Sequence, residues 1–167
     1  SAAVTGKLMP APACQRFCMQ IITELSELRA TVAAWRLAGL KVAFVPTMGN
    51  LHAGHFKLVT TAREHADKVI VSIFVNPLQF ENKSDLESYP KSFEQDLQFA
   101  KEAGATAVFT PSELDIYPGQ IEKIEAGSVG DIFEGRSRPG HFSGVLTVVK
   151  RLFDLVQPKH AVFGEKD

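Results

Sequence analysis

An almost continuous apolar run, KVIVSIFV at residues 68–75, most constrains the fold of this chain. A strand with one face in water alternates apolar and polar residues, so a run without this alternation predicts a strand that is buried on both faces. Buried strands of this kind belong to parallel sheets that helices cover on both sides. The run therefore predicts a parallel sheet inside an α/β fold.

Helix-like and strand-like patterns alternate along the rest of the chain. Repeated strand–helix–strand units favour right-handed crossovers and a doubly wound sheet, in which ligands bind beyond the carboxyl ends of the strands. The patterns predict further strands at residues 20–22, 41–45, 106–109 and 161–163, and helices from an N-cap at Thr23 to Gly39, over 54–66, over 92–103 and over 145–156. The residues expected to face the core are Leu25, Leu28, Val32 and Trp35 in the first helix and Phe93, Leu97 and Ala100 in the third. Between 111 and 139 only Ile121 and Ile124 suggest an element, a small hairpin.

The composition limits the class of protein. With 167 residues, 45% of them hydrophobic, the chain is long enough to bury a core as one domain. Its net charge of -1 gives no global basic field for nucleic acid, and no apolar run approaches the roughly 18 residues of a membrane span. We expect residues 1–18, which hold Cys14 and Cys18, to be a tag or flexible leader, and residues 19–167 to form a cytoplasmic domain without disulfides.

The strongest functional motif is the tetrad HAGH at residues 52–55, at a turn between a predicted strand and a predicted helix. The first N–H groups of a helix lack partners and carry partial positive charge, which favours a phosphate there. Gly49 and Gly54 allow the backbone to approach such a ligand closely. If the helix begins near Ala53, the imidazoles of His52 and His55 project to the same side of its first turn and can donate to one phosphate chain.

Two other interpretations of the tetrad remain open. Histidine pairs bind zinc, although this spacing without a nearby carboxylate or cysteine matches the usual ligand patterns poorly. Alternatively, the two histidines are caps or surface polar groups of the helix. The tetrad alone does not decide among phosphate binding, zinc binding and capping.

Five sequence blocks in register resemble the pantothenate synthetase family. They are VPTMGNLHAGH at residues 45–55, FVNPLQF at 74–80, YP at 89–90, RPGHF at 138–142 and FGEKD at 163–167. The resemblance implies a Rossmann-like fold of the HxGH nucleotidyltransferase type. It also implies a reaction in which ATP, with Mg²⁺, adenylates pantoate with loss of pyrophosphate, before the amine of β-alanine displaces AMP.

The resemblance assigns roles to residues in these blocks. His52 and His55 would donate to the phosphates of ATP and Lys166 would supply a complementary cation, so these three residues would carry catalysis by charge stabilisation. The expected contacts to ATP are Met48, Gly49, Asn50, Leu51, His52, Ala53, Gly54, His55, Gly164, Glu165, Lys166 and Asp167.

Substrate contacts are expected in three of the blocks. Gln79 matches the family position that holds pantoate and later meets β-alanine, and its side-chain amide offers both a donor and an acceptor. Thr47, Asn76 and Arg138 are further candidates for these substrates. Asn76 equally fits a turn residue, and Arg138 equally fits a surface ion pair.

The metal assignment is open in the sequence. Asp96 is the candidate contact to Mg²⁺ by position, but Gln95 stands where the family leads us to expect a second acid. Alternatively, Mg²⁺ is bound by the phosphates of ATP rather than by the protein, because it gives up its water ligands reluctantly.

The sequence given ends at residue 167, before the segments that the family uses to close over ATP. The resemblance therefore implies an N-terminal nucleotide-binding domain without its C-terminal lid domain, and weak or no turnover by this chain alone, because closure completes such sites. A homodimer is also implied, with the apolar strand at 69–75 a candidate part of its interface. The alternatives are a non-catalytic nucleotide-binding or assembly module and another HxGH nucleotidyltransferase.

Overall fold

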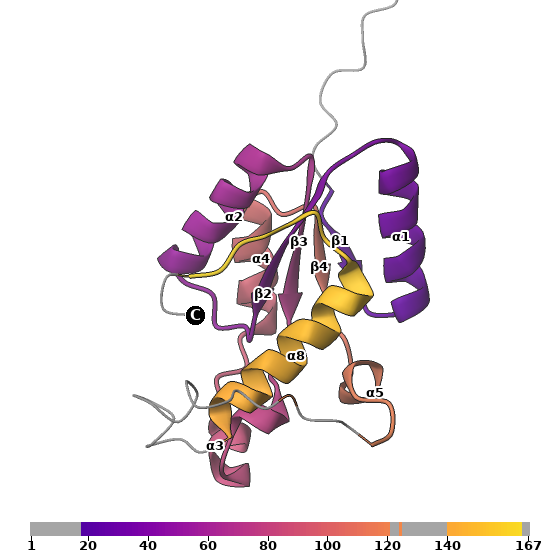
Figure 1. Cartoon of the computed structure of the whole chain (residues 1–167). Coiled ribbons are helices and arrows are strands. Elements are labelled where there is room, and N and C mark those ends of the chain that lie inside the picture. Colours follow the sequence, from indigo (N-terminus) through magenta and orange to yellow (C-terminus); the bar gives the residue numbers. More distant parts are fainter. Residues whose placement is uncertain (1–17, 121–123, 125–139, 165–167) are drawn as a thin grey trace, which may run out of the picture.

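Five parallel strands form one sheet in the computed structural model, which describes residues 18–120, 124 and 140–164 (Figure 1). The strands stand in the order β1-β4-β3-β2-β5. Their bounds are Gln20–Ile22 (β1), Val42–Thr47 (β2), Lys68–Ile73 (β3), Ala107–Phe109 (β4) and His160–Ala161 (β5). The predicted parallel sheet is confirmed, and every predicted strand is present with its ends shifted by at most two residues.

Strand β3 lies in the middle of the sheet, between β2 and β4. Val69, Ile70 and Val71 are at most 1% exposed, as the apolar run predicted. The strands β2 and β4 flank these three residues, and helices cover both faces of the sheet around them. Their side chains therefore cannot contact a second copy of the chain, and the prediction that they contribute to a dimer interface is wrong.

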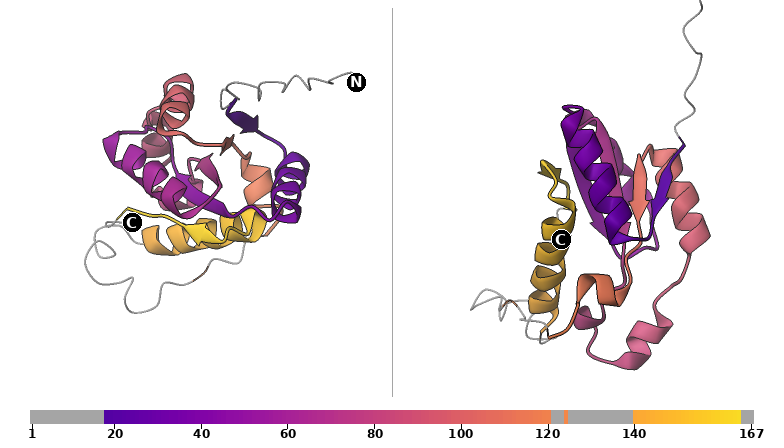
Figure 2. Two further views of the ribbon diagram at one scale, coloured as in Figure 1. Left: turned by 90° about the horizontal axis from the view of Figure 1, so that it is seen from above. Right: turned by 90° about the vertical axis from the view of Figure 1, so that its right-hand side faces the viewer.

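Helices cover both faces of the sheet, so the doubly wound arrangement is confirmed (Figure 2). The bounds of these helices are Leu25–Leu37 (α1) and His141–Val156 (α8) on one face, and Ala53–His65 (α2) and Phe93–Ala103 (α4) on the other. Successive strand residues alternate between the two cores. Phe44 and Ile70 pack on the side of α1 and α8, whereas Val45 and Val71 pack on the side of α2 and α4.

The predicted core faces of the helices are confirmed with one exception. Leu28 and Val32 of α1 are buried, and Ala100 of α4 is buried beside the partly buried Leu97. Phe93, however, is 45% exposed. It is the first residue of α4 and precedes the turns that pack on the sheet, so the expectation that it faces inward was wrong.

Three short helices follow strand ends where the sequence predicted none. They are η1 (Pro77–Gln79), α3 (Lys83–Ser88) and α5 (Glu113–Ile116). Each spans fewer than two helical turns, so no period of apolar residues marks it in the sequence.

The helix starts also differ from the prediction, by four residues at α8 and by one residue at α1, α2 and α4. α8 begins at His141, four residues early, after Gly140 in the left-handed region (φ 77°). The N-cap of α1 is Glu24 rather than Thr23, because Glu24 keeps extended backbone while its carbonyl accepts the first helical bond from Leu28. Ile124 lies outside any strand, and its proposed hairpin partner at 121 lies outside the described residues.

The strand order creates the point at which ligands bind in folds of this kind. From β2 the chain proceeds to β3 and β4 on one side, whereas β5 lies on the other side of β2. Ligands of doubly wound sheets bind where the strand order reverses, outside the carboxyl ends of the strands. The loops that follow β2 and β5 flank this point, and Val162 N–H donates to the Phe44 carbonyl at 3.0 Å.

Strand β2 continues past the end of β5 toward this point. The carbonyl of Phe44 faces β5, so the backbone of Pro46, two residues later, faces the same side. Pairing with β5 involves only Ala43 and Phe44 of β2. At Pro46 no residue of β5 lies alongside, so a backbone N–H group there would have no partner in β5. Proline is tolerated here because no ladder bond is lost.

The expected leader falls almost wholly outside the described residues, which begin at Cys18, an exposed cysteine. Cys14 lies outside them. Among the helices of the described part, none is both long and apolar enough to cross a membrane.

Candidate active site

The HAGH tetrad forms the N-terminus of α2, which begins at Ala53 as the phosphate interpretation required. The N-cap is His52, whose Nδ1 accepts a hydrogen bond from Gly54 N–H at 3.1 Å. His55 reaches back, and its Nδ1 accepts from His52 N–H at 3.2 Å. The two histidines thus form a capping box, a role usually taken by Ser or Thr paired with Glu or Gln.

This capping box determines which ring nitrogen of each histidine can donate. A backbone N–H is always the donor, so Nδ1 of His52 and of His55 must be unprotonated acceptors, and in the neutral imidazole the proton then sits on Nε2. The ring centroids lie 4.2 Å apart, with His52 exposed and His55 half-buried. Capping and phosphate donation are therefore compatible, because capping uses Nδ1 and donation to a phosphate would use Nε2–H.

The glycine of the tetrad is required by space rather than by backbone conformation. A Cβ atom at Gly54 would lie 2.8 Å from Cε1 and 3.0 Å from Nδ1 of His52. Contacts below 3.0 Å do not occur at real Cβ atoms, so the His52 ring would have to move. Only glycine leaves room for the imidazole that caps the helix.

The loop between β2 and His52 holds two consecutive residues in the left-handed region, Gly49 (φ 79°) and Asn50 (φ 52°). Thr47 stabilises its start: the hydroxyl donates to the Ser72 carbonyl at 2.7 Å and accepts from Gly49 N–H at 3.2 Å. The hydroxyl of this candidate substrate residue is thus engaged within the protein, and Thr47 is 9% exposed.

Asp96 is the residue named from the sequence as a contact to Mg²⁺. Its carboxylate is 4% exposed and accepts hydrogen bonds from the backbone N–H of Asn50 (2.9 Å) and Leu51 (2.8 Å) and from the hydroxyl of Ser92 (3.1 Å). Mg²⁺ demands octahedral geometry and keeps several waters, which this enclosed and already bonded carboxylate does not suit. Among the described residues no group of three His, Cys, Asp or Glu side chains is placed to hold a metal ion.

A second polar cluster lies after β3 and is centred on Asn76, which is fully buried. Its Nδ2 donates to Oε1 of Gln79 at 2.9 Å and to the Gly144 carbonyl at 3.0 Å. Its Oδ1 accepts from Leu78 N–H at 3.3 Å and from the Tyr117 hydroxyl at 2.7 Å. Because Oε1 of Gln79 faces Asn76, the amino group of the same side-chain amide is directed away from Asn76.

Tyr117 remains a donor in this cluster over the whole physiological range. Its pKa is raised to about 12, mainly by burial; the side-chain contact with Asn76 lowers the pKa, and the nearby charge of Glu113 raises it. The phenol is therefore protonated at neutral pH and fixes the Asn76 amide.

The N-terminal turns of α8 close the cluster from the other side. His141 Nδ1 lies 3.2 Å from the Gln79 carbonyl. A Cβ atom at Gly144 would lie 2.5 Å from the Leu78 carbonyl oxygen, so glycine is needed where α8 meets η1. Sequence reasoning missed the roles of His141, Gly144 and Tyr117, although His141 stands within the RPGHF block that carried part of the resemblance.

The structure brings the predicted residues together in two groups. The loop at 48–51 and the tetrad form one, and Asn76 with Gln79 forms the other. Gly164, a further expected contact to ATP, follows β5, the strand that pairs with β2. Four predicted site residues lie outside the described part of the chain: Arg138, Glu165, Lys166 and Asp167.

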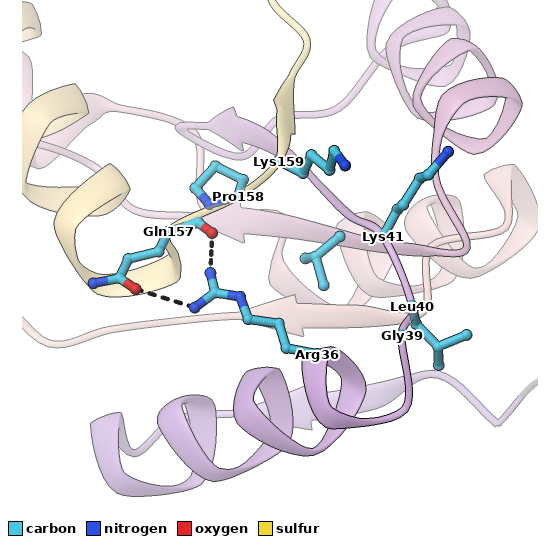
Figure 3. A pocket seen from close by; sticks show the side chains of 8 residues that line it. Arg36, Gly39, Leu40, Lys41, Gln157, Pro158 and Lys159 are labelled. Atoms are coloured by element: carbon cyan, nitrogen blue, oxygen red, sulfur yellow. Dashed lines mark hydrogen bonds between the residues drawn. The ribbon is translucent and has the colours of Figure 1, made fainter.

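A cavity of about 520 Å³ lies at the other end of the sheet, next to the residues that precede β2 and β5 (Figure 3). Three of its lining residues are cationic, Arg36, Lys41 and Lys159. Arg36 is committed to the C-terminus of α8: its guanidinium donates to Gln157 Oε1 at 3.0 Å and to the Val156 carbonyl at 3.2 Å. Since ligands of such sheets bind at the carboxyl ends of the strands, we do not assign the nucleotide to this cavity.

Comparison with known proteins gives one family for this chain. The family profile described as pantoate-beta-alanine ligase matches residues 20–167. The chain is 54% identical over 152 residues to the pantothenate synthetase of Colwellia psychrerythraea and 51% identical to that of Nitrosococcus oceani, covering 89% of this chain and 53% of each relative. It spans about half the length of the curated relatives that it matches.

Solved structures give the same result. A pantoate-beta-alanine ligase from Francisella tularensis, complexed with beta-gamma ATP and beta-alanine, superimposes with a TM-score of 0.81 and 42% identity over 86% of this chain and 55% of that chain. The pantothenate synthetase of Thermus thermophilus superimposes with a TM-score of 0.76 and 43% identity, over 86% and 51% of the two chains. Matching family profile, identity above 50% and shared fold leave one conclusion: the chain belongs to the pantoate-β-alanine ligase family.

Proposed function

We propose that this chain is the nucleotide-binding domain of a pantothenate synthetase, which condenses pantoate with β-alanine at the expense of ATP. The capping box of His52 and His55 carries the proposal, because it directs two neighbouring Nε2–H donors to the N-terminus of α2. A helix N-terminus with two added donors suits the phosphates of ATP. The F. tularensis relative, complexed with beta-gamma ATP and beta-alanine, supports this choice of ligands.

The proposed reaction has two steps. A carboxylate oxygen of pantoate attacks the α-phosphorus of ATP, the bond from that phosphorus to pyrophosphate breaks, and pantoyl-adenylate forms. The amine of β-alanine then attacks the acyl carbon, an amide bond forms, and the acyl–oxygen bond to AMP breaks. No protein nucleophile is needed, so the protein acts by alignment and by stabilising charge on the phosphate.

Each described residue then has a specific task. His52 and His55 donate from Nε2 to phosphate oxygens on which negative charge develops. Gln79 binds pantoate through the amino group of its side-chain amide, because Asn76 already occupies the amide oxygen. Asn76 therefore orients Gln79, and Thr47 shapes the loop rather than binding substrate through its engaged hydroxyl.

Two assignments rest on residue type alone. Lys166 is the cation for the phosphates and Arg138 the partner for a carboxylate or phosphate, since both side chains suit anions. Because the described residues do not form a protein-held metal site, we propose that Mg²⁺ enters with the phosphates of ATP. A homodimer formed through this domain remains a prediction, which the mass of the protein in solution from light scattering will test.

Calorimetric titration of the purified chain with ATP and with pantoate tests the proposal. We expect His55→Ala to weaken ATP binding by about 10- to 150-fold, the effect of one lost hydrogen bond to a charged group, and Gln79→Ala to weaken pantoate binding only. His65→Ala is the matched control, because His65 lies at the far end of the same helix. No heat with either ligand would refute the proposal, and AMP release at the rate of a full-length relative would refute the expected weak turnover.

A further inference from the structure

Asp96 connects helix α4 to the loop that precedes the tetrad. It lies in the first turn of α4, yet both oxygens of its carboxylate accept from the loop: Oδ2 from Asn50 N–H at 2.9 Å and Oδ1 from Leu51 N–H at 2.8 Å. The contact is close, since a Cβ atom at Gly49 would lie 3.0 Å from Oδ2. One carboxylate thus binds two consecutive amides immediately before His52.

These bonds fix one conformation of a loop that could adopt others. Gly49 and Asn50 both have positive φ, a region that glycine and asparagine enter readily and leave as readily unless surrounding structure holds them. The two amide bonds to Asp96 supply that support. Because His52 follows Leu51 directly, they also set the position from which the N-cap ring starts.

The surroundings of Asp96 are those of a structural acceptor rather than a metal ligand. Its donors are two backbone amides and the Ser92 hydroxyl, all neutral, and the side chain is 4% exposed. A metal ion would have to displace the loop amides from oxygens that already bind them. The phenol of Tyr89 lies near enough that its pKa is raised first by burial and then by the negative charge of Asp96, so it stays protonated beside the carboxylate.

We propose that Asp96 is a positioning residue for nucleotide binding, which presents His52 and His55 to the phosphates by fixing the backbone of Asn50 and Leu51, and that it does not ligate Mg²⁺. This inference rests on the proposed function, in that it names the nucleotide as the ligand of the tetrad. It predicts a defect in nucleotide binding that is independent of metal. A metal ligand predicts a defect only when the metal is present.

The central experiment compares Asp96→Asn with the wild type in calorimetric titrations with ADP, in excess EDTA and in excess MgCl₂. An asparagine amide keeps one acceptor oxygen but turns an NH₂ group toward the other loop amide. We expect ADP affinity to fall at least about tenfold, by the same factor in both buffers. A loss confined to the MgCl₂ buffer would overturn the proposal.

Two variants serve as matched controls. Glu94→Gln removes an equally charged carboxylate from the same turn of α4, and because Glu94 is exposed we expect unchanged affinity. Ser92→Ala removes the third donor to Asp96 while leaving both loop bonds, and we expect less than a threefold change. A tenfold loss in Glu94→Gln would mean that charge on this turn, and not the loop bonds, determines affinity, and would overturn the proposal.

Nuclear magnetic resonance of the wild-type chain tests the loop bonds even if Asp96→Asn does not fold. We expect scalar couplings across the hydrogen bonds from the Asn50 and Leu51 amide nitrogens to the Asp96 carboxyl carbon, and no shift of that carbon when MgCl₂ is added alone. Absent couplings, or a carboxyl shift with MgCl₂ alone, would overturn the proposal. If the wild type binds no ADP, the proposed function fails, while the couplings still decide whether Asp96 holds the loop.

Discussion

The Gly54→Ala substitution tests whether the tetrad glycine exists to make room for the His52 ring. The new Cβ would lie 2.8 Å from Cε1 of that ring, so the imidazole must rotate and give up its bond to the amide of residue 54. Loss of an N-cap bond costs about 1 kcal/mol (roughly 0.5–2). Alanine in place of glycine stabilises a helix by about 0.8–1 kcal/mol.

The two effects nearly cancel, so we expect the free energy of unfolding to stay within about 1 kcal/mol of the wild type. In a His52→Ala background the cap is already absent, and Gly54→Ala should then stabilise the protein by up to about 1 kcal/mol. The double-mutant cycle therefore predicts a coupling of about 1 kcal/mol between positions 52 and 54. The physical source of that coupling is the steric conflict between ring and methyl group.

Urea denaturation, followed by the fluorescence of Trp35, measures all four proteins of the cycle. With a slope of about 1–3 kcal/mol/M, a change of 1 kcal/mol moves the midpoint by roughly 0.3–1 M, which is easily resolved. A second cycle that pairs Gly54→Ala with His65→Ala is the control, since His65 lies at the other end of α2 and should not couple. Free energies that add within about 0.3 kcal/mol in the first cycle would refute the steric explanation.

Two further predictions concern the cluster around Asn76. Gly144→Ala should destabilise the protein by about 1–3 kcal/mol, because its Cβ would lie 2.5 Å from the Leu78 carbonyl oxygen; an unchanged urea midpoint would contradict this. The raised pKa of Tyr117, about 12, means that the unfolded chain loses the phenolic proton first, so the stability that Tyr117 contributes is complete below pH 10 and falls as the pH rises toward 12. Tyr117→Phe should therefore lose less stability than the wild type between pH 9 and pH 11 in urea denaturation, and equal losses would contradict the assignment.

Much of the architecture was readable because its signals are local. The unbroken apolar run of β3 predicted burial on both faces, and the helix start at Ala53 followed from a strand, a glycine-rich turn and an apolar helical period in sequence. The short helices η1, α3 and α5 were missed for the converse reason, since elements of three to six residues have too few positions to display a period. Phe93 was misjudged because the period describes a face of a helix but not where contact with the sheet begins.

The residues of the candidate site were named from the sequence, but the bonds among them were not. The tetrad, Asn76 and Gln79 were all named from the sequence, yet the capping box was treated as an alternative to phosphate donation, whereas the two functions use different nitrogens of the same rings. From the sequence, Asp96 was named as a contact to Mg²⁺. The position of an acid in the sequence does not show which backbone amides its carboxylate will bind in the fold.

The sequence by itself determined the parallel sheet, its coverage on both faces and the strand-to-helix turn that holds His52 and His55. These follow from the order of apolar, β-branched and turn-forming residues along a few neighbouring positions. Only the tertiary structure decided that Asp96 binds the amides of Asn50 and Leu51, 46 and 45 residues away, and that Asn76 meets the Gly144 carbonyl, 68 residues away. Hydrogen bonds between distant segments depend on which elements the strand order makes neighbours, and that information is not present in any local stretch of the chain.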